Sequence, residues 1–263
     1  MSSVGEYETI GVTVEDYVAT LELQCPPNNF FSVAMIGEIA DALEALDGMK
    51  ECRTVLLCSE GKHFCAGNDF SEREGPGDQT SGPAGTSPLY VQGVRLFKTR
   101  KPIVAAVQGA AIGGGLGLAM AADFRVTCPE ARFSANFSQL GFHHGFGLSM
   151  TLPKAIGFQQ ANLLLYTGRR LKGDEAQRLG MAEYLVALVD VRARALELAR
   201  EIAGAGPLAV ESIRETMRAG MAEAYKEATG REAAEQARLR KTEDFKEGVK
   251  AVGERRTPDF KGK

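Results

Sequence analysis

The stretch 140–147, LGFHHGFG, places two of the three histidines of this 263-residue chain side by side between glycines. A neutral imidazole can act as a general base near neutral pH. His143 and His144 also precede a helix expected from Gly147 toward Lys154, and the positive end of its dipole would lower their pKa values. Because adjacent side chains do not readily point into one pocket, we favour His144 as the base. The alternative is that both histidines only fill a turn.

Two glycine-containing turns could bind a negatively charged oxygen. GGGLG at 113–117 follows an expected buried strand and opens a helix, whereas FCAGND at 64–69 leaves an earlier buried strand through small residues. The first N–H groups of a helix have no partner within it, so such turns can stabilise an oxyanion. The other interpretation of the glycine cluster is close packing of a helix on a sheet, and the cluster lacks the G-x-G-x-x-G spacing of a dinucleotide loop.

Hydrophobic periodicity predicts the elements that would position these groups. Alternation predicts a hairpin from strands at 8–14 and 18–23, and helical spacing predicts a helix over 32–46 with Ser32 as its N-cap. Further expected elements are strands at 54–58, 103–107 and 124–127 and helices at 116–122, 208–218, 221–240 and 243–252, the last one starting after Thr242. No strand is expected from Val191 onward. This order is typical of an α/β core with largely parallel sheets followed by a helical tail.

Composition excludes several classes of protein. The 31 basic and 34 acidic residues nearly cancel, which argues against nucleic acid or a membrane surface as a partner. The apolar runs are too short to span a bilayer, and the N-terminus does not resemble a signal peptide. The five cysteines form no C-x-x-C pair, and nothing has the spacing of metal ligands. We therefore expect a cytoplasmic protein without a bound metal. The Gly/Pro/Ser-rich stretch 74–88 is expected to be a surface loop.

The motifs GKHFCAGNDF at 61–70 and KPIVAAVQGAAIGGGLGLAMAADFRV at 101–126 resemble the crotonase superfamily of enoyl-CoA hydratases and isomerases. The resemblance continues through ARFSANFSQLG, LPKAIG, LLYTGRRLKGDEAQRLGMAEYLV and EGVKAVGERRTPDFKGK, so it covers essentially the whole chain in order. It implies an α/β fold with a crotonase-like spiral of ββα units over residues 1–203. An all-helical C-terminal region over 204–263 would form a homotrimer or a dimer of trimers.

The resemblance also implies the ligand. Family members bind coenzyme A thioesters without a prosthetic group, and two backbone N–H groups stabilise a thioester enolate. By position these donors are the N–H groups of Asn68 and Gly114. Losing one such donor costs on the order of 3 kcal/mol. The residues implied to bind coenzyme A are Lys62, Phe64, Ala66 and Asn68, with Lys263 reaching the phosphates from a neighbouring subunit.

The chain departs from the hydratase pattern at two positions. The resemblance aligns Gly117 and Phe137 with the two glutamates that place and split water, so both carboxylates are missing. The aspartate nucleophile of related aryl-CoA dehalogenases aligns with Gly145 and is missing too. We therefore expect a lyase or isomerase that forms a stabilised enolate, with His144 or His143 as base. Isomerisation, decarboxylation and carbon–carbon cleavage stay open.

Two other interpretations remain. A catalytically inactive homologue would bind acyl-CoA with the oxyanion turns but would lack the chemistry. A purely structural oligomer would have its acyl channel obstructed, with Phe137, Phe142 and Phe146 as the plugs. These three side chains otherwise indicate an acyl pocket rich in aromatic surface, which Tyr90 could also approach.

Overall fold

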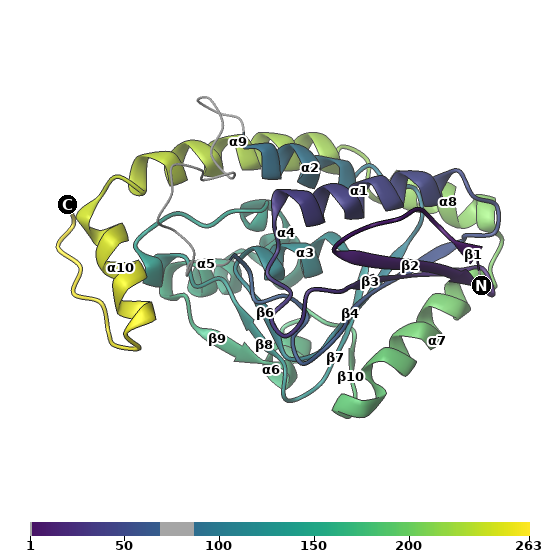
Figure 1. The fold of residues 1–263 in the computed structure, drawn as a ribbon, viewed down its shortest axis with the longest axis horizontal. Coiled ribbons are helices and arrows are strands. Elements are labelled where there is room, and N and C mark those ends of the chain that lie inside the picture. Colours follow the sequence, from purple (N-terminus) through teal and green to yellow (C-terminus); the bar gives the residue numbers. More distant parts are fainter. Residues whose placement is uncertain (1, 69–86) are drawn as a thin grey trace.

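A largely parallel sheet forms the centre of the fold (Figure 1). This computed structural model describes residues 2–68 and 87–263, in which seven strands pair in the order β1-β2-β3-β4-β5-β7-β10. They are β1 (Ser2–Ser3), β2 (Ile10–Glu15), β3 (Val18–Leu23), β4 (Thr54–Ser59), β5 (Ile103–Val107), β7 (Phe124–Thr127) and β10 (Tyr184–Leu185). The first three strands pair antiparallel and all later neighbours pair parallel. The predicted hairpin and the largely parallel sheet are therefore confirmed.

A second, smaller sheet brings the two glycine turns together. Its strands are β6 (Ala110–Ile112), β8 (Arg132–Ser134) and β9 (Arg170–Lys172), paired in the order β6-β8-β9. Cys65, in the segment that leaves β4, forms a parallel bridge to Ala111 of β6. Because both segments run in the same direction, the turns that follow them lie at the same end.

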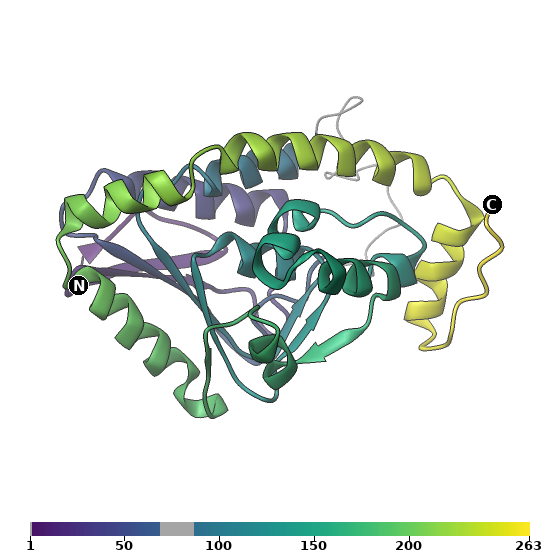
Figure 2. The same ribbon diagram turned by 180° about the vertical axis from the view of Figure 1, so that it is seen from behind.

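Helices cover both faces of the main sheet, with α1 on one side and α7 on the other (Figure 1). The helices of the described residues are α1 (Val33–Asp47), α2 (Pro88–Leu96), α3 (Gly114–Ala121), α4 (Leu148–Ile156), α5 (Phe158–Thr167), α6 (Gly173–Arg178), α7 (Val191–Ala203), α8 (Pro207–Met217), α9 (Met221–Leu239) and α10 (Glu243–Gly253). Seen from behind, α8 and α9 run along one edge and α10 folds down beside the C-terminus (Figure 2). None of these helices is long and apolar enough to cross a membrane.

Two predicted helix starts are confirmed by their caps. The Ser32 hydroxyl accepts a hydrogen bond from Met35 N–H at 3.1 Å, and the Thr242 hydroxyl accepts one from Phe245 N–H, also at 3.1 Å. Each cap satisfies a donor that the first turn leaves unpaired. The region after Val191 is helical as expected, but it begins with a helix, α7, that was not predicted.

An ion cluster ties the C-terminal helices to the main sheet. The Asp123 carboxylate accepts hydrogen bonds from Arg214 Nε at 2.9 Å, from Arg218 Nη1 at 2.8 Å and from Ile103 N–H at 2.8 Å. Because the three side chains of the cluster are largely shielded from water, each charge depends on the others for compensation. Asp123 therefore has a structural role. The region 204–263 begins just before α8, and its part in assembly stays a prediction.

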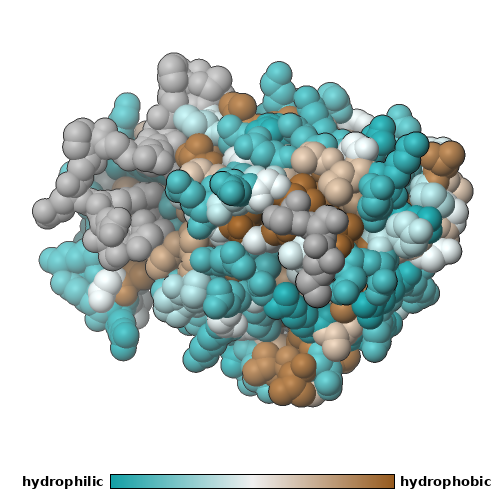
Figure 3. Space-filling model, turned by 45° about the vertical axis from the view of Figure 1, so that its right-hand side comes forward, coloured by the Kyte–Doolittle hydropathy of each residue, from teal (hydrophilic) through white to brown (hydrophobic). Residues whose placement is uncertain are grey.

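The outer surface is mainly hydrophilic in the view of Figure 3, with separate apolar patches among the polar side chains. A quarter of the residues are charged, and this composition accounts for that character. The expected loop at 74–88 lies outside the described residues except for positions 87 and 88, at the start of α2.

Candidate active site

The two glycine turns lie against each other. Ile112 N–H donates a hydrogen bond to the carbonyl oxygen of Cys65 at 3.1 Å, which joins the two strands just before the turns. A β-carbon built on Gly67 would lie 3.8 Å from the backbone nitrogen of Gly114. Asn68 follows Gly67 directly, and both Asn68 and Gly114 line the same cavity. The two residues that the resemblance assigns as oxyanion donors are thus brought together.

Glycine is required where the two backbones meet. A β-carbon on Gly115 would lie 2.1 Å from the carbonyl oxygen of Cys65, and one on Gly67 would lie 2.6 Å from the carbonyl oxygen of Ile112. Gly67 also has a φ of 85°, a conformation that side chains other than hydrogen disfavour. The close approach of the turns therefore depends on the absence of side chains at these positions.

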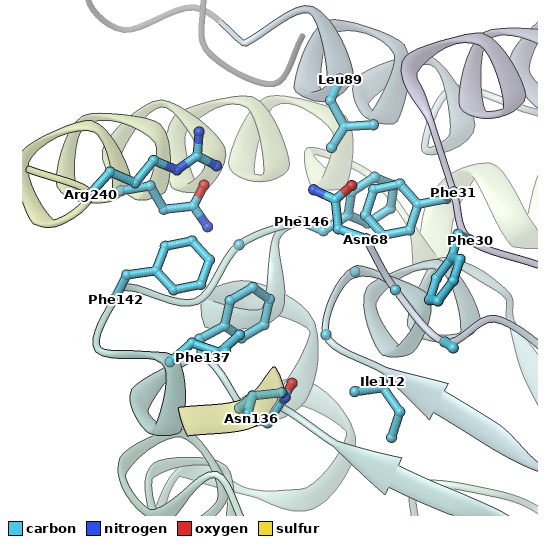
Figure 4. Close-up of a pocket in the computed structure, with 18 of the residues that line it drawn as sticks. Phe30, Phe31, Asn68, Leu89, Ile112, Asn136, Phe137, Phe142, Phe146 and Arg240 are labelled. Atoms are coloured by element: carbon cyan, nitrogen blue, oxygen red, sulfur yellow. The ribbon is translucent and has the colours of Figure 1, made fainter. Parts of the chain in front are cut away.

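The cavity beside the turns has a volume of about 250 Å³. It is bordered by the turns, by α2, by the segment around 136–146 and by the ends of the C-terminal helices (Figure 4). Its aromatic lining consists of Phe30, Phe31, Tyr90, Phe137, Phe142 and Phe146. The polar side chains in the lining are those of Asn68, Asn136, Gln236 and Arg240, besides the Tyr90 hydroxyl. The three phenylalanines named as plugs border this space and leave it open.

Neither of the two positions that the resemblance aligns with glutamates carries a carboxylate. A β-carbon on Gly117 would lie 2.8 Å from Cβ of Phe146, so Phe146 fills the space beside position 117. Phe137 is itself part of the cavity wall. Among the described residues, no aspartate or glutamate lines the cavity. The described wall therefore offers no carboxylate to activate water.

The two histidines stand beside the cavity, and neither is among its described lining residues. Their rings stack with centroids 4.1 Å apart, and His143 Nδ1 lies 2.8 Å from the carbonyl oxygen of His144. His144 Nε2 faces Glu232 Oε1 at 3.8 Å. Burial, reinforced by His143, lowers the pKa of His144 to about 3. The imidazole is thus neutral near pH 7, through burial rather than through the helix terminus that the sequence indicated. The role of either histidine as a base stays a prediction.

Glu232 is a buried carboxyl group that sequence reasoning missed. It lies on α9 and accepts hydrogen bonds from Gly147 N–H at 2.8 Å and from both the N–H and the hydroxyl of Ser149, so it caps the start of α4. Burial raises the pKa of Glu232 to about 7. Since His144 is neutral at that pH, their 3.8 Å approach is not an ion pair there.

A helical pattern could have indicated the burial of Glu232. Tyr225, Thr229 and Gln236 are buried and lie seven, three and four residues away, on the same face of α9. Gln236 was missed too, although it borders the cavity. Phe30 and Phe31 also line the cavity. The sequence offered a signal for them, because they come directly before Ser32, the predicted cap of α1.

The residues assigned to coenzyme A are distributed over two parts of the chain. Lys62 is exposed, Phe64 is fully buried, and Ala66 borders the cavity. Lys263 is exposed beyond α10, and its carbonyl oxygen accepts a hydrogen bond from Asp244 N–H at 3.1 Å. Their contacts with coenzyme A stay predictions. In the described part of the chain, no group of His, Cys, Asp and Glu is arranged to hold a metal ion.

Comparison with known proteins agrees with this geometry. The family model for enoyl-CoA hydratase/isomerase matches residues 13–263. The chain belongs to the enoyl-CoA hydratase/isomerase family. This family membership confirms the crotonase resemblance, and the fold is confirmed by the solved structures that follow.

Two relatives and two structures illustrate the family similarity. The chain is 32% identical over 264 residues to a carnitinyl-CoA dehydratase of Proteus mirabilis, covering 97% of this chain and 99% of the relative. It is 32% identical over 244 residues to the mitochondrial methylglutaconyl-CoA hydratase of Homo sapiens, covering 89% and 70%. A structure of an enoyl-CoA hydratase/isomerase from Pseudoalteromonas atlantica has a TM-score of 0.86 at 29% identity, covering 97% and 100%. The structure of Pseudomonas aeruginosa OdaA has a TM-score of 0.83 at 28% identity, covering 93% and 98%.

Proposed function

We propose that this chain is an enzyme acting on an acyl-CoA thioester, and that the N–H groups of Asn68 and Gly114 hold the thioester oxygen. The observation that carries the proposal is the contact of the two turns, with a Gly67 β-carbon placed 3.8 Å from the Gly114 nitrogen. The oxygen gains negative charge when a proton leaves the α-carbon. Donors already fixed by backbone structure stabilise that charge without reorganisation, each by on the order of 3 kcal/mol.

The reaction we propose is enolate chemistry of the lyase or isomerase type, not hydration by two glutamates. Its support is the cavity wall, where Gly117 and Phe137 stand at the aligned positions and Phe146 fills the adjoining space. The names of the relatives describe addition or removal of water from a CoA thioester, which agrees with the substrate class. The absence of acidic residues from the described wall also favours a second candidate, an acyl-CoA-binding homologue without catalysis.

We also propose how coenzyme A binds and how the subunits assemble. Coenzyme A would lie along Lys62, Phe64 and Ala66, with Lys263 of a neighbouring subunit near the phosphates. The subunits would form a homotrimer or a dimer of trimers in the cytoplasm, as family resemblance and composition indicate. The apolar side chains that α8 exposes support assembly, because exposed apolar side chains are stabilised when another subunit covers them. They are Leu208, Ile213 and Met217.

Calorimetric titration with acetoacetyl-CoA, with free coenzyme A as control, tests the binding proposal. We expect the thioester to bind more tightly than coenzyme A because only the thioester offers an oxygen to the two N–H groups. Equal affinities would remove the support for the oxyanion site. If neither compound binds, the chain has the family's fold without its ligand.

The histidine hypothesis makes a separate prediction. If His144 is the base, His144→Ala should slow exchange of the substrate's α-proton with D₂O by 10²- to 10⁴-fold, because general-base catalysis contributes about that factor. His143→Ala is the matched control and should change the rate only slightly. The measurement is the loss of the α-proton signal by NMR in a thioester that the wild type exchanges. If neither variant slows exchange, the base is another group. If the wild type exchanges the α-proton of none of the thioesters tested, the non-catalytic candidate is favoured.

A further inference from the structure

Aromatic rings lie directly against the proposed oxyanion turn. A β-carbon on Gly114 would lie 2.0 Å from ring carbons of Phe31, and one on Gly113 would lie 3.6 Å from Cζ of Phe137. Phe31 and Phe137 therefore border the backbone whose N–H group would hold the thioester oxygen. The first carbons of an acyl group bound there would lie close to these rings.

The two phenylalanines belong to separate aromatic clusters. Phe31 packs on Phe146 with ring centroids 5.6 Å apart, and Tyr90 meets Phe146 edge to face at 6.4 Å. On the other side, Phe137 and Phe142 have centroids 5.5 Å apart. Figure 4 shows Phe137 and Phe142 on one side of the cavity and Phe31 and Phe146 on the other. The space between the clusters is thus walled by aromatic rings on both sides.

The polar groups of Tyr90 and Gln236 in the wall bond to each other and to the backbone. The Tyr90 hydroxyl donates to Gln236 Oε1 at 3.0 Å, and Gln236 Nε2 donates to the carbonyl oxygen of His143 at 3.0 Å. A peptide carbonyl can only accept, so this contact fixes the orientation of the Gln236 amide. An apolar group can occupy the neighbouring space without leaving these groups unpaired.

We propose that the acyl group of the substrate carries an aromatic ring one or two carbons from the thioester carbonyl, as in an arylacetyl-CoA. This inference rests on the proposed function, since it takes the Asn68 and Gly114 turns as the carbonyl site. The cavity of about 250 Å³ exceeds the roughly 150 Å³ in which benzene binds. A ring between the two clusters gains aromatic contacts beyond the burial of its surface. An arylacetyl group also retains the α-hydrogen that enolate formation requires.

Phenylacetyl-CoA and cyclohexylacetyl-CoA test this proposal, because both have the same number of heavy atoms and the same α-methylene group. Their dissociation constants would be measured by calorimetry, with free coenzyme A alongside. We expect phenylacetyl-CoA to bind about two- to ten-fold more tightly than cyclohexylacetyl-CoA. In Phe137→Leu and Phe142→Leu, each checked for folding by circular dichroism, this ratio should fall toward one. Phe158→Leu is the matched control, because Phe158 is 70% exposed on α5, and it should keep the wild-type ratio.

The possible outcomes separate the two proposals. Equal affinity for the two thioesters, both tighter than coenzyme A, would overturn the aromatic acyl group and leave the oxyanion site standing. A ratio that both cavity variants leave unchanged would also overturn it, because the ring would then lie elsewhere. If both thioesters bind only as well as coenzyme A, the proposed function fails together with this inference.

Discussion

Replacing Gly115 by alanine is expected to lower the turnover of a thioester substrate by 10²- to 10³-fold. The added β-carbon would lie 2.1 Å from the Cys65 carbonyl oxygen, and backbone on both sides cannot yield as a flexible side chain would. The start of α3 must therefore move away from the 65–68 segment, which separates the N–H groups of Gly114 and Asn68. Removing one oxyanion donor has an effect of that size. Overpacking should also lower the free energy of unfolding by about 1–3 kcal/mol.

Gly230→Ala is the control for Gly115→Ala. Gly230 lies within α9, and a β-carbon there would meet no atom within 4 Å. This variant should keep wild-type turnover and gain slightly in stability, since alanine favours a helix by about 1 kcal/mol over glycine. Steady-state kinetics and denaturant unfolding of the folded variants provide the measurements. Wild-type turnover in Gly115→Ala would mean that the contact of the two turns does not position the reacting carbonyl.

The wild type is expected to lose stability relative to Glu232→Gln as the pH rises from 4.5 to above 7. Burial raises the pKa of Glu232 from 4.5 to about 7, so the folded state holds this proton more tightly than the unfolded state. The stabilisation is fully present below pH 4.5 and is lost as the pH rises through 7. The difference in the free energy of unfolding between the two proteins should change by about 3 kcal/mol over this range. Denaturant unfolding at a series of pH values measures it.

His144 contributes a pH dependence of the opposite sign. Its pKa is lowered from 6.5 to about 3, so its contribution is present above pH 6.5 and is lost as the pH falls toward 3. Glu232→Gln should therefore retain the loss of stability on the acidic side, whereas His144→Ala should retain the loss on the alkaline side. A difference between wild type and Glu232→Gln that does not vary with pH would show that Glu232 is not buried as an ionisable group.

Elements with strong periodicity were predictable from the sequence. The hairpin, α1 with Ser32 and α10 with Thr242 follow from local patterns and caps, which need no information about distant residues. The sequence of α7, VRARALELAREIA, carries charged side chains at close intervals and relies on alanines for part of its buried face, so its pattern was easy to overlook. The two glycine turns, which we propose as the oxyanion site, were identified because glycine at a strand end is itself a local signal.

The remainder of the site depends on contacts between distant segments. Glu232 lies 83 residues from Ser149 and reaches it only because α9 crosses α4. Phe146 adopts a φ of 57°, and this irregular backbone directs it to the space beside Gly117. The direction of a side chain in such a loop follows from its dihedral angles, which residue types do not specify. For the same reason, the sequence could not show that His143 and His144 both lie outside the described lining of the cavity.

Isotope-edited infrared spectroscopy of a bound thioester is the most direct test of the Asn68 and Gly114 oxyanion site. An acyl-CoA labelled with ¹³C at the thioester carbonyl reports the hydrogen bonds to that oxygen through its C=O stretching frequency. We predict that the frequency falls below its value in water when the thioester binds to the wild type, and that Gly115→Ala loses most of this change. A bound thioester whose carbonyl keeps its frequency in water would contradict the assignment of the Asn68 and Gly114 N–H groups as the oxyanion site.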